Sequence, residues 1–150
     1  MKRIFRIFGF AFLAASLLPA CSGKVPAPVS VNEAADTCAA CGMTVRNNGF
    51  AAELLNRDGQ VLKFDDAGCL LRYFGEHPEL KKAFAFVQDR NTREWVPATE
   101  AFYVTSAEDP TPMGSGIHAY GKEASAAIFA KAHPASVRAD WQSLSSGGRN

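Results

Sequence analysis

Short apolar runs separated by turn residues recur through the middle of this chain. Residues 50–55 (FAAELL) and 61–64 (VLKF) each have the length of one strand, and Asp58-Gly59 between them is a strong signal for a tight hairpin turn. Three further runs share this length and composition: AFAFVQD (83–89), EAFYVTS (100–106) and IHAY (117–120). The pattern predicts strands joined by short connections.

Two longer stretches predict helices instead. The first is DDAGCLLRYFGEHPEL (65–80), in which Asp65 or Asp66 can cap the first amides and Pro78 ends the helix. The second is KEASAAIFAKAHP (122–134), which also ends at a proline. Because each helix follows a pair of predicted strands, we expect strand-strand-helix units.

The two predicted units match each other at a constant offset of 56 residues. This offset aligns Phe64 with Tyr120, Tyr73 with Phe129, and His77-Pro78 with His133-Pro134. Both histidines stand at a predicted helix end, where a histidine more often meets the last carbonyls than a metal. We therefore predict an α+β fold in which two similar strand-strand-helix units pack together, as after an internal duplication.

The N-terminal segment has the pattern of a secretory signal. Residues 1–20 begin with MKRIFR, continue with an apolar run and end in small residues. The sequence Leu-Pro-Ala-Cys that ends at Cys21 resembles the lipobox of bacterial lipoproteins, which implies that Cys21 carries lipid. Ser22 after it resembles the signal for sorting to an outer membrane. Residues 21–36, with two prolines and little periodicity, are predicted to be an extended leash.

Removing the predicted signal changes the charge balance. The chain has 16 basic and 15 acidic residues. Three basic residues lie in residues 1–20, so their loss leaves 13 basic residues (16 minus 3) against the same 15 acidic ones. A near-neutral domain has no basic stripe to hold nucleic acid, so we exclude that class of partner. We place the folded domain at residues 37–143 and expect residues 144–150 to be a disordered tail.

The remaining cysteines point to metal or redox chemistry. With Cys21 assigned to lipid, Cys38, Cys41 and Cys69 are left, an odd number for an oxidising compartment where structural cysteines pair. Cys38-x-x-Cys41 is followed by Gly42, which lets the backbone bend around a bound atom, and by Met43. Cys69 lies among leucines on the first predicted helix, where a buried, inert thiol is the favoured interpretation.

A second segment offers a thioether. In PTPMGSG (110–116), prolines and glycines predict an irregular loop that carries Met113. Thiolate and thioether together suit Cu(I), which is soft and accepts two or three ligands. A structural zinc site would need four ligands, with only Cys69 and scattered histidines to complete the pair. A thioredoxin-like redox pair would be expected at a helix start after a strand. Cu(I) binding is therefore favoured, and a structural zinc site and a redox-active cysteine pair remain as alternatives.

These motifs, taken together, resemble the NosL family. They are Cys-x-x-Cys-Gly-Met after the leash, Phe-Asp-Asp-x-Gly-Cys-Leu-Leu-Arg-Tyr at residues 64–73, and Pro-Met-Gly-Ser-Gly before an aromatic strand. The resemblance covers about residues 36–132. It implies two small units of strands and a helix, related to the treble-clef-like arrangement of mercury-resistance lyases. It also implies that one Cu(I) is bound by Cys41 and Met113 first, with Met43 and Cys38 next and His118 as a weaker candidate.

The same resemblance implies a function. Resemblance to NosL proteins implies that the chain is a membrane-tethered periplasmic copper chaperone, which receives Cu(I) from a membrane copper donor. It would supply the ion to an acceptor cuproenzyme, in denitrifiers nitrous oxide reductase. Such a protein transfers metal by ligand exchange and is not an enzyme. The alternatives are a periplasmic thiol-disulfide oxidoreductase that uses Cys38 and Cys41, and a lipid-anchored module with a structural zinc.

Overall fold

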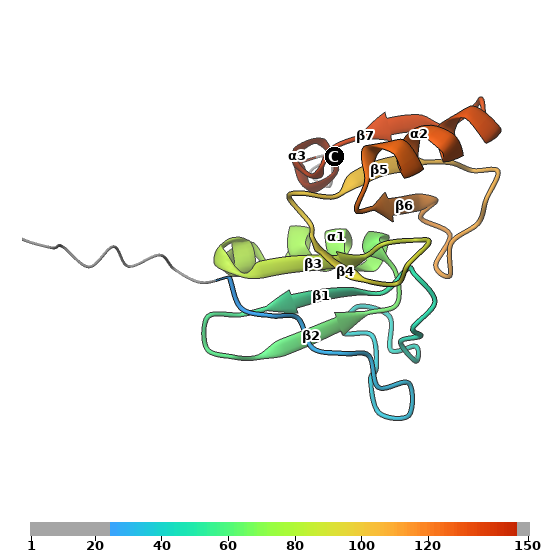
Figure 1. The fold of residues 1–150 in the computed structure, drawn as a ribbon. Helices are drawn as coiled ribbons and strands as arrows, with labels where there is room; N and C mark the ends of the chain where they lie inside the picture. Colours follow the sequence, from blue (N-terminus) through green and yellow to red (C-terminus); the bar gives the residue numbers. More distant parts are fainter. Residues whose placement is uncertain (1–24, 147–150) are drawn as a thin grey trace, which may run out of the picture.

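The computed structural model describes residues 25–146 (Figure 1). The predicted signal segment and Cys21 lie outside these residues. In chain order the elements are β1 (Ala52–Leu55), β2 (Val61–Phe64), α1 (Ala67–Glu76), a short 3-10 helix η1 (Pro78–Lys82), β3 (Phe84–Gln88), β4 (Trp95–Pro97), β5 (Phe102–Thr105), β6 (Ile117–Tyr120), α2 (Glu123–Ala132), β7 (Val137–Ala139) and α3 (Trp141–Ser146). Within residues 25–146, no helix has the length and apolar character needed to cross a membrane.

The strands form two antiparallel sheets that lie on either side of α1 in Figure 1. The first sheet has the order β2-β1-β3-β4 and the second has the order β6-β5-β7. Helix α1 contacts both β1 and β6, whereas α2 packs on β5 and β6. The main core surrounds α1 and includes the fully buried Phe64, Leu70 and Tyr103. The predicted α+β class is confirmed.

The offset of 56 residues seen in the sequence is present in the structure. Strands β2 and β6 are 56 positions apart at both ends, and so are helices α1 and α2. The histidine ring that ends each helix stacks on the aromatic ring one turn earlier: His77 on Tyr73 at 4.1 Å between centroids, and His133 on Phe129 at 4.0 Å. Each hairpin, helix and following strand therefore has a counterpart in the other unit.

Both histidines end their helices, as predicted, but their rings differ in partner. The backbone N–H of each donates to the carbonyl four residues earlier, at 3.0 Å in both cases. The Nδ1 atom of His133 also lies 3.0 Å from the Phe129 carbonyl oxygen. The Nδ1 atom of His77 instead lies 2.9 Å from the Glu79 carboxylate. At the other end of α1, Asp66 is the residue whose side chain caps the helix.

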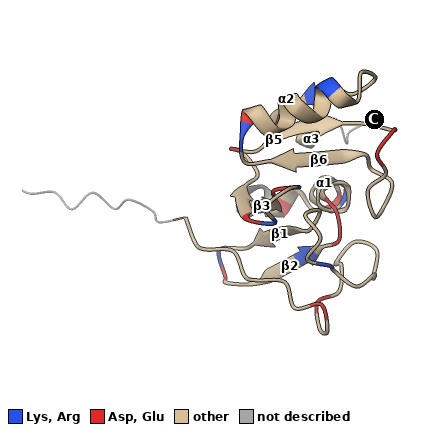
Figure 2. Ribbon diagram, turned by 45° about the vertical axis from the view of Figure 1, so that its right-hand side comes forward, with Lys and Arg blue, Asp and Glu red and all other residues tan. Residues whose placement is uncertain are grey.

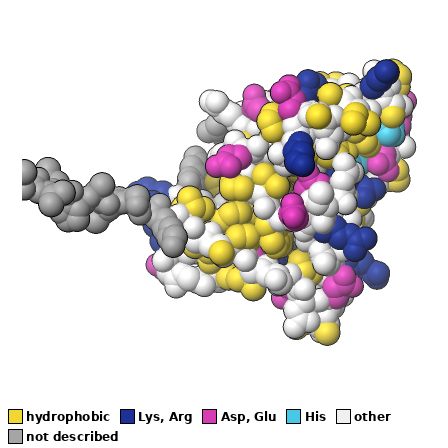
Figure 3. All heavy atoms as spheres, viewed as in Figure 1, with side chains coloured by type: hydrophobic (Ala, Val, Ile, Leu, Met, Phe, Trp, Pro, Cys, Tyr) yellow, Lys and Arg dark blue, Asp and Glu magenta, His cyan; other side chains and the backbone are white. Residues whose placement is uncertain are grey.

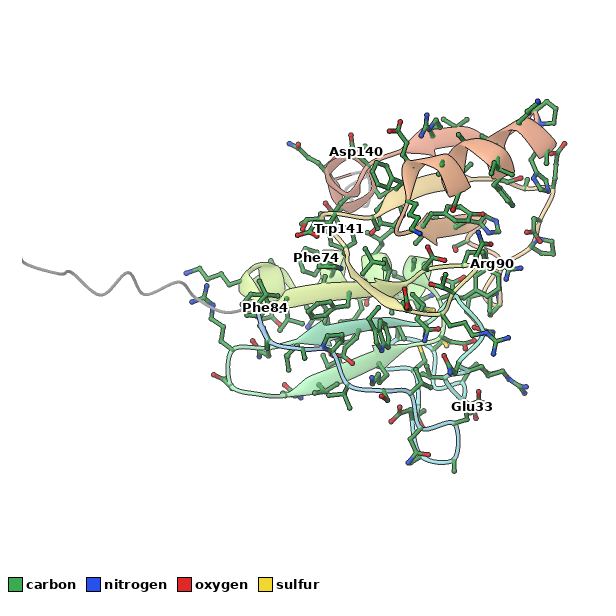
Figure 4. The ribbon with its side chains drawn as sticks, in the orientation of Figure 1. Glu33, Phe74, Phe84, Arg90, Asp140 and Trp141 are labelled. Atoms are coloured by element: carbon green, nitrogen blue, oxygen red, sulfur yellow. The ribbon has the colours of Figure 1, made fainter. Side chains whose placement is uncertain are left out.

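The C-terminal end is more ordered than its composition suggested. Residues 144–146 belong to α3, so the disordered tail was predicted to begin too early; residues 147–150 lie outside the described part. The Asp140 carboxylate accepts the Ser143 N–H at 2.7 Å and starts the helix. Trp141 packs edge-on against Phe74 of α1 at 5.9 Å between centroids (Figure 4). Local capping and the packing of Trp141 and Leu144 against the core thus stabilise a helix that has little intrinsic signal.

The predicted leash is partly attached to the fold. The Val29 N–H donates to both carboxylate oxygens of Glu53, at 3.2 and 3.1 Å, and the Lys63 ammonium donates to the Val29 carbonyl. Figure 2 shows that charged residues of both signs occur in both units. Unlike most charged residues, Glu53 and Lys63 are buried, and they form an ion pair with each other. Val31 also packs against the core. The ordered domain therefore includes residues that were assigned to the leash.

An apolar surface lies where the chain enters the fold. Hydrophobic side chains gather around β3 and β4 on the face shown in Figure 3. There Val25, Phe84, Phe86 and Pro97 are among the residues that line a shallow groove. Val25, the first described residue, therefore forms part of this groove.

Candidate metal centre

A tight loop positions the Cys38/Cys41 pair before β1. The Cys38 N–H donates to the Met43 carbonyl at 2.8 Å, and the Gly42 N–H donates back to the Cys38 carbonyl at 2.9 Å. Gly42 has φ 76°, a left-handed conformation that glycine adopts without a Cβ penalty. We call residues 38–43 the first knuckle. Its closure brings the two sulfurs to one side of the loop.

Helix α1 adds a third sulfur to this pair. Cys69 lies in the first turn of α1, and the sulfurs of Cys38, Cys41 and Cys69 all lie within 4.8 Å of one another. Cys69 is buried, as the sequence predicted, but it lies in this cluster and not only among leucines. The signal that could have placed it there is the odd number of cysteines. All three thiols are free in the structure.

The three thiols have different electrostatic surroundings. Burial alone would raise the pKa of Cys38, but its sulfur accepts the backbone N–H groups of Asp65, Ala40 and Cys41, and the net effect lowers that pKa. Burial raises the pKa of Cys41, and it raises the pKa of Cys69 much further, with the nearby sulfurs adding to the shift. The surroundings therefore favour the thiolate form more at Cys38 than at Cys41 or Cys69. Because a thiol binds metal only as the thiolate, metal binding would release the protons of Cys41 and Cys69.

The loop that carries Met113 is attached to the same helix. The Asp66 carboxylate caps α1 through the Gly68 and Cys69 N–H groups, at 2.6 and 3.1 Å. Its other oxygen accepts hydrogen bonds from the loop: from the Thr111 hydroxyl at 2.6 Å, the Ser115 hydroxyl at 2.9 Å and the Met113 N–H at 3.3 Å. One buried carboxylate thus fixes the methionine loop relative to the first turn of α1.

Met113 and Cys69 share one surface pocket. Both line it together with Asp66, Arg72 and Ser115. The Met113 side chain is 41% exposed, whereas Cys69 is 3% exposed. The thioether therefore stands at the solvent side of a pocket whose inner wall includes one sulfur of the cluster.

Comparison with known proteins decides the family. The family model described as NosL matches residues 28–140. This chain belongs to the NosL family. The match starts earlier than the motifs alone suggested, in agreement with the attachment of Val29 to the sheet. A search of curated protein sequences gave no match.

A solved structure supports the fold of this NosL-family chain. The crystal structure of the copper chaperone NosL from Shewanella denitrificans superposes with a TM-score of 0.67 at 16% sequence identity. The similar region covers 77% of this chain and 93% of the Shewanella chain. At this identity the likeness establishes a shared fold. The closer relation to mercury-resistance lyases stays a prediction.

The other two predicted ligands of the NosL-family site, Met43 and His118, have opposite exposure. The Met43 side chain is 57% exposed, and its backbone N–H donates to the Cys41 sulfur. His118 is fully buried in β6, where Nε2 lies 3.1 Å from the Asp109 carbonyl and the ring packs on Phe129. The sequence could not fix which way His118 faces. In the structure it belongs to the core of the second unit.

The donor set favours a soft cation of low coordination number. The cluster has three sulfurs, and within residues 25–146 no histidine, aspartate or glutamate joins it. A structural zinc site is almost always four-coordinate, whereas Cu(I) accepts three soft ligands. The geometry therefore fits the soft-metal interpretation of the sequence and extends it by one residue, Cys69.

Proposed function

We propose that this NosL-family protein is a Cu(I) chaperone that holds one ion between the sulfurs of Cys38, Cys41 and Cys69. The observation that carries this proposal is the position of three sulfurs within 4.8 Å of one another. A thioether-bearing loop lines the pocket beside them. Met113 acts at the open side of the site as the ligand that meets incoming and outgoing copper.

The burial of the cysteines argues against the thiol-disulfide oxidoreductase alternative. A catalytic thiolate of that class is accessible and has a lowered pKa. Here the thiol with the lowered pKa is Cys38, which is 2% exposed. The more accessible Cys41 has a raised pKa, caused mainly by burial. An attacking thiolate would therefore be on the wrong residue, while a metal ion can use both.

Copper transfer proceeds by ligand exchange. Cys38 and Cys69 are buried, but Cys41 and Met113 are partly exposed, so an acceptor approaches from the side of these two residues. A donor atom of the acceptor bonds to Cu(I) as one sulfur of this chain leaves it. Copper stays in the +1 state throughout, and no covalent bond of either protein is made or broken. The protein is accordingly a carrier and not an enzyme.

The site of action follows from the N-terminal sequence. Lipid on Cys21 would hold the domain at the periplasmic face of a bacterial membrane, with Ser22 favouring the outer membrane. Tethering raises the effective concentration of the domain near a membrane copper donor and an acceptor cuproenzyme. Nitrous oxide reductase is the acceptor that the family suggests. Fatty-acid labelling of cells that express the protein should mark the parent chain and be lost in Cys21→Ser.

A Cu(I) competition titration tests the copper site. The metal-free, reduced domain is titrated against a chelator of known affinity, and one equivalent should bind tightly. Cys41→Ser and Cys69→Ser should each lower the affinity by orders of magnitude, and Met113→Ala by roughly tenfold. Met43→Ala is the matched control and should leave the affinity unchanged. Binding that is indifferent to Cys69 and Met113 would contradict the proposal.

A further inference from the structure

The second unit contains a loop with the geometry of the first knuckle. In residues 38–43 and again in residues 89–94, the N–H of the first residue donates to the carbonyl of the sixth at 2.8 Å. In both loops the N–H of the fifth residue donates to the carbonyl of the first at 2.9 Å. That fifth residue has a left-handed backbone each time, with φ 76° at Gly42 and φ 63° at Arg93. We call residues 89–94 the second knuckle.

Each knuckle is joined to its own hairpin in the same way. The N–H of the second knuckle residue donates to the hairpin strand that precedes the helix: Ala39 to the Lys63 carbonyl at 2.9 Å, and Arg90 to the Ala119 carbonyl at 2.8 Å. Lys63 and Ala119 are related by the same offset of 56 residues as the helices. The second knuckle is therefore a structural counterpart of the first and not a chance likeness of one turn.

The first side chain of each knuckle sits in a cage of three backbone N–H groups. Two come from the third and fourth residues of the knuckle, and one comes from the residue that follows the hairpin. Around the Cys38 sulfur the donors are Ala40, Cys41 and Asp65. Around the Asp89 carboxylate they are Asn91 at 2.8 Å, Thr92 at 2.9 Å and Gly121 at 2.6 Å. The same cage thus holds a sulfur in one unit and a carboxylate in the other.

The other two sulfurs also have oxygen counterparts. Thr92 takes the place of Cys41, and its Oγ1 accepts the Glu94 N–H at 3.3 Å, just as the Cys41 sulfur accepts the Met43 N–H. Ser125 takes the place of Cys69 in the first turn of α2. Asp89, Thr92 and Ser125 line one pocket, to which Lys122 also contributes. The pocket therefore offers oxygen atoms and a cation where the first unit offers sulfur.

We infer that the second knuckle is a metal-free copy of the first, in which the Asp89 carboxylate fills the cage of N–H groups that the Cys38 sulfur fills in the first unit. Both carboxylate oxygens of Asp89 already accept N–H groups, and Lys122 repels a cation. The second unit braces the fold and limits the chain to one soft-metal site. Only this last statement, on stoichiometry, rests on the proposed function.

Exchange of the two caged residues tests the equivalence. In metal-free, reduced protein, Cys38→Ala leaves three N–H groups without an acceptor, whereas Cys38→Asp supplies the carboxylate that the second cage holds. We expect the unfolding equilibrium constant of Cys38→Ala to exceed that of Cys38→Asp by roughly tenfold or more. In the second unit, Asp89→Cys should likewise be more stable than Asp89→Ala. If the Asp and Ala variants of Cys38 are equally unstable, the inference is wrong.

Conversion of the second knuckle to thiols tests its latent capacity. Reduced protein is titrated with Cd²⁺ and followed by thiolate-to-metal charge-transfer absorption. The parent should bind one equivalent, and Asp89→Cys/Thr92→Cys/Ser125→Cys should bind two. If the parent binds none and the variant binds one, the proposed function fails but the copy is established. A folded variant that binds no more than the parent overturns the copy. If the triple variant does not fold, the comparison of Cys38→Asp with Cys38→Ala described above tests the inference instead.

Discussion

The Asp66 carboxylate accepts a hydrogen bond from the Thr111 hydroxyl at 2.6 Å, although the two residues are 45 positions apart. The same carboxylate caps α1 through the Cys69 N–H. The loop that carries Met113 and the helix that carries Cys69 therefore share one buried acidic group. The distance between thioether and thiol depends on that group, although Asp66 itself lies outside the sulfur cluster.

Replacement of Asp66 should affect both stability and copper binding. Asp66→Asn keeps the size of the side chain but gives up one acceptor atom, either to the helix or to the loop. We expect a loss of about 1–2 kcal/mol in the free energy of unfolding. Chemical denaturation measures this loss. The matched control is Asp65→Asn, since the Asp65 side chain accepts one long hydrogen bond, from the Arg46 N–H at 3.4 Å.

The same variant separates positioning from a purely structural role. If Asp66 positions Met113, then Met113→Ala should weaken Cu(I) binding less in the Asp66→Asn background than in the parent. Competition titrations of the four proteins give this double-mutant cycle. Additive effects would show that Asp66 supports the fold without placing the thioether.

A methyl group at Gly68 should push the methionine loop away. A Cβ atom there would lie 2.3 Å from the Ser115 Cβ, closer than real Cβ contacts allow. Alanine inside a helix would otherwise stabilise the protein by about 1 kcal/mol relative to glycine. We therefore expect Gly68→Ala to lower both thermal stability and Cu(I) affinity. Ser115→Gly added to it should restore part of the stability, and a stabilised single variant would contradict the tight packing.

The buried ion pair beneath Val29 should be costly to break from one side. Lys63→Met leaves the Glu53 carboxylate buried without its ammonium partner, and it also removes the donor to the Val29 carbonyl. We expect a loss of about 3–5 kcal/mol in unfolding free energy. Glu53→Leu combined with Lys63→Met should recover much of that loss, as measured by urea denaturation. A single variant that loses less than about 1 kcal/mol would contradict this account.

The Asp89 cage predicts a particular dependence of stability on pH. Burial alone would raise the pKa of Asp89, but the N–H groups of Gly121, Thr92 and Asn91 outweigh it and lower the pKa. A carboxyl group with a depressed pKa in the folded state stabilises the fold above its unfolded pKa. That stability is lost as the pH falls through the folded value.

The parent should therefore exceed Asp89→Asn in unfolding free energy at neutral pH. The gap should narrow once the pH falls below about 4, the unperturbed pKa of aspartate. Urea denaturation of both proteins between neutral and acid pH measures the gap. A difference that stays constant or widens in acid would show that the carboxylate charge is not what the cage stabilises.

Elements with strong local signals could be predicted from the sequence. The two hairpin strands that precede the helices, β2 and β6, have the predicted bounds, because compact apolar runs followed by helix starts define them. The aromatic and histidine matches that suggested a duplication recur as matched ring stacking. In contrast, β4 and β7 have three residues each and exist because of their pairing partners, β3 and β5.

The site was only partly predictable for a similar reason. The Cys38/Cys41 pair is contiguous, so its local geometry could be expected from spacing and from Gly42. Cys69 joins the pair only because α1 packs against the knuckle, which is tertiary information. His118 is a suitable metal ligand by chemistry, but its access to a metal depends on which face of the strand its side chain occupies. In β6 that side chain points into the core. The match between Cys38 and Asp89 is invisible in the sequence, since a carboxylate has replaced a thiol.

X-ray absorption spectroscopy at the copper K-edge, which identifies and counts the atoms bonded to copper, tests the central claim most directly. The spectrum is recorded on the Cu(I)-loaded reduced domain and on its Cys69→Ser variant. The account predicts a first shell of sulfur alone around copper in the parent, and a shell with fewer sulfur atoms in the variant. A parent shell that contains nitrogen or oxygen donors, or a shell unchanged by Cys69→Ser, would contradict the three-cysteine site.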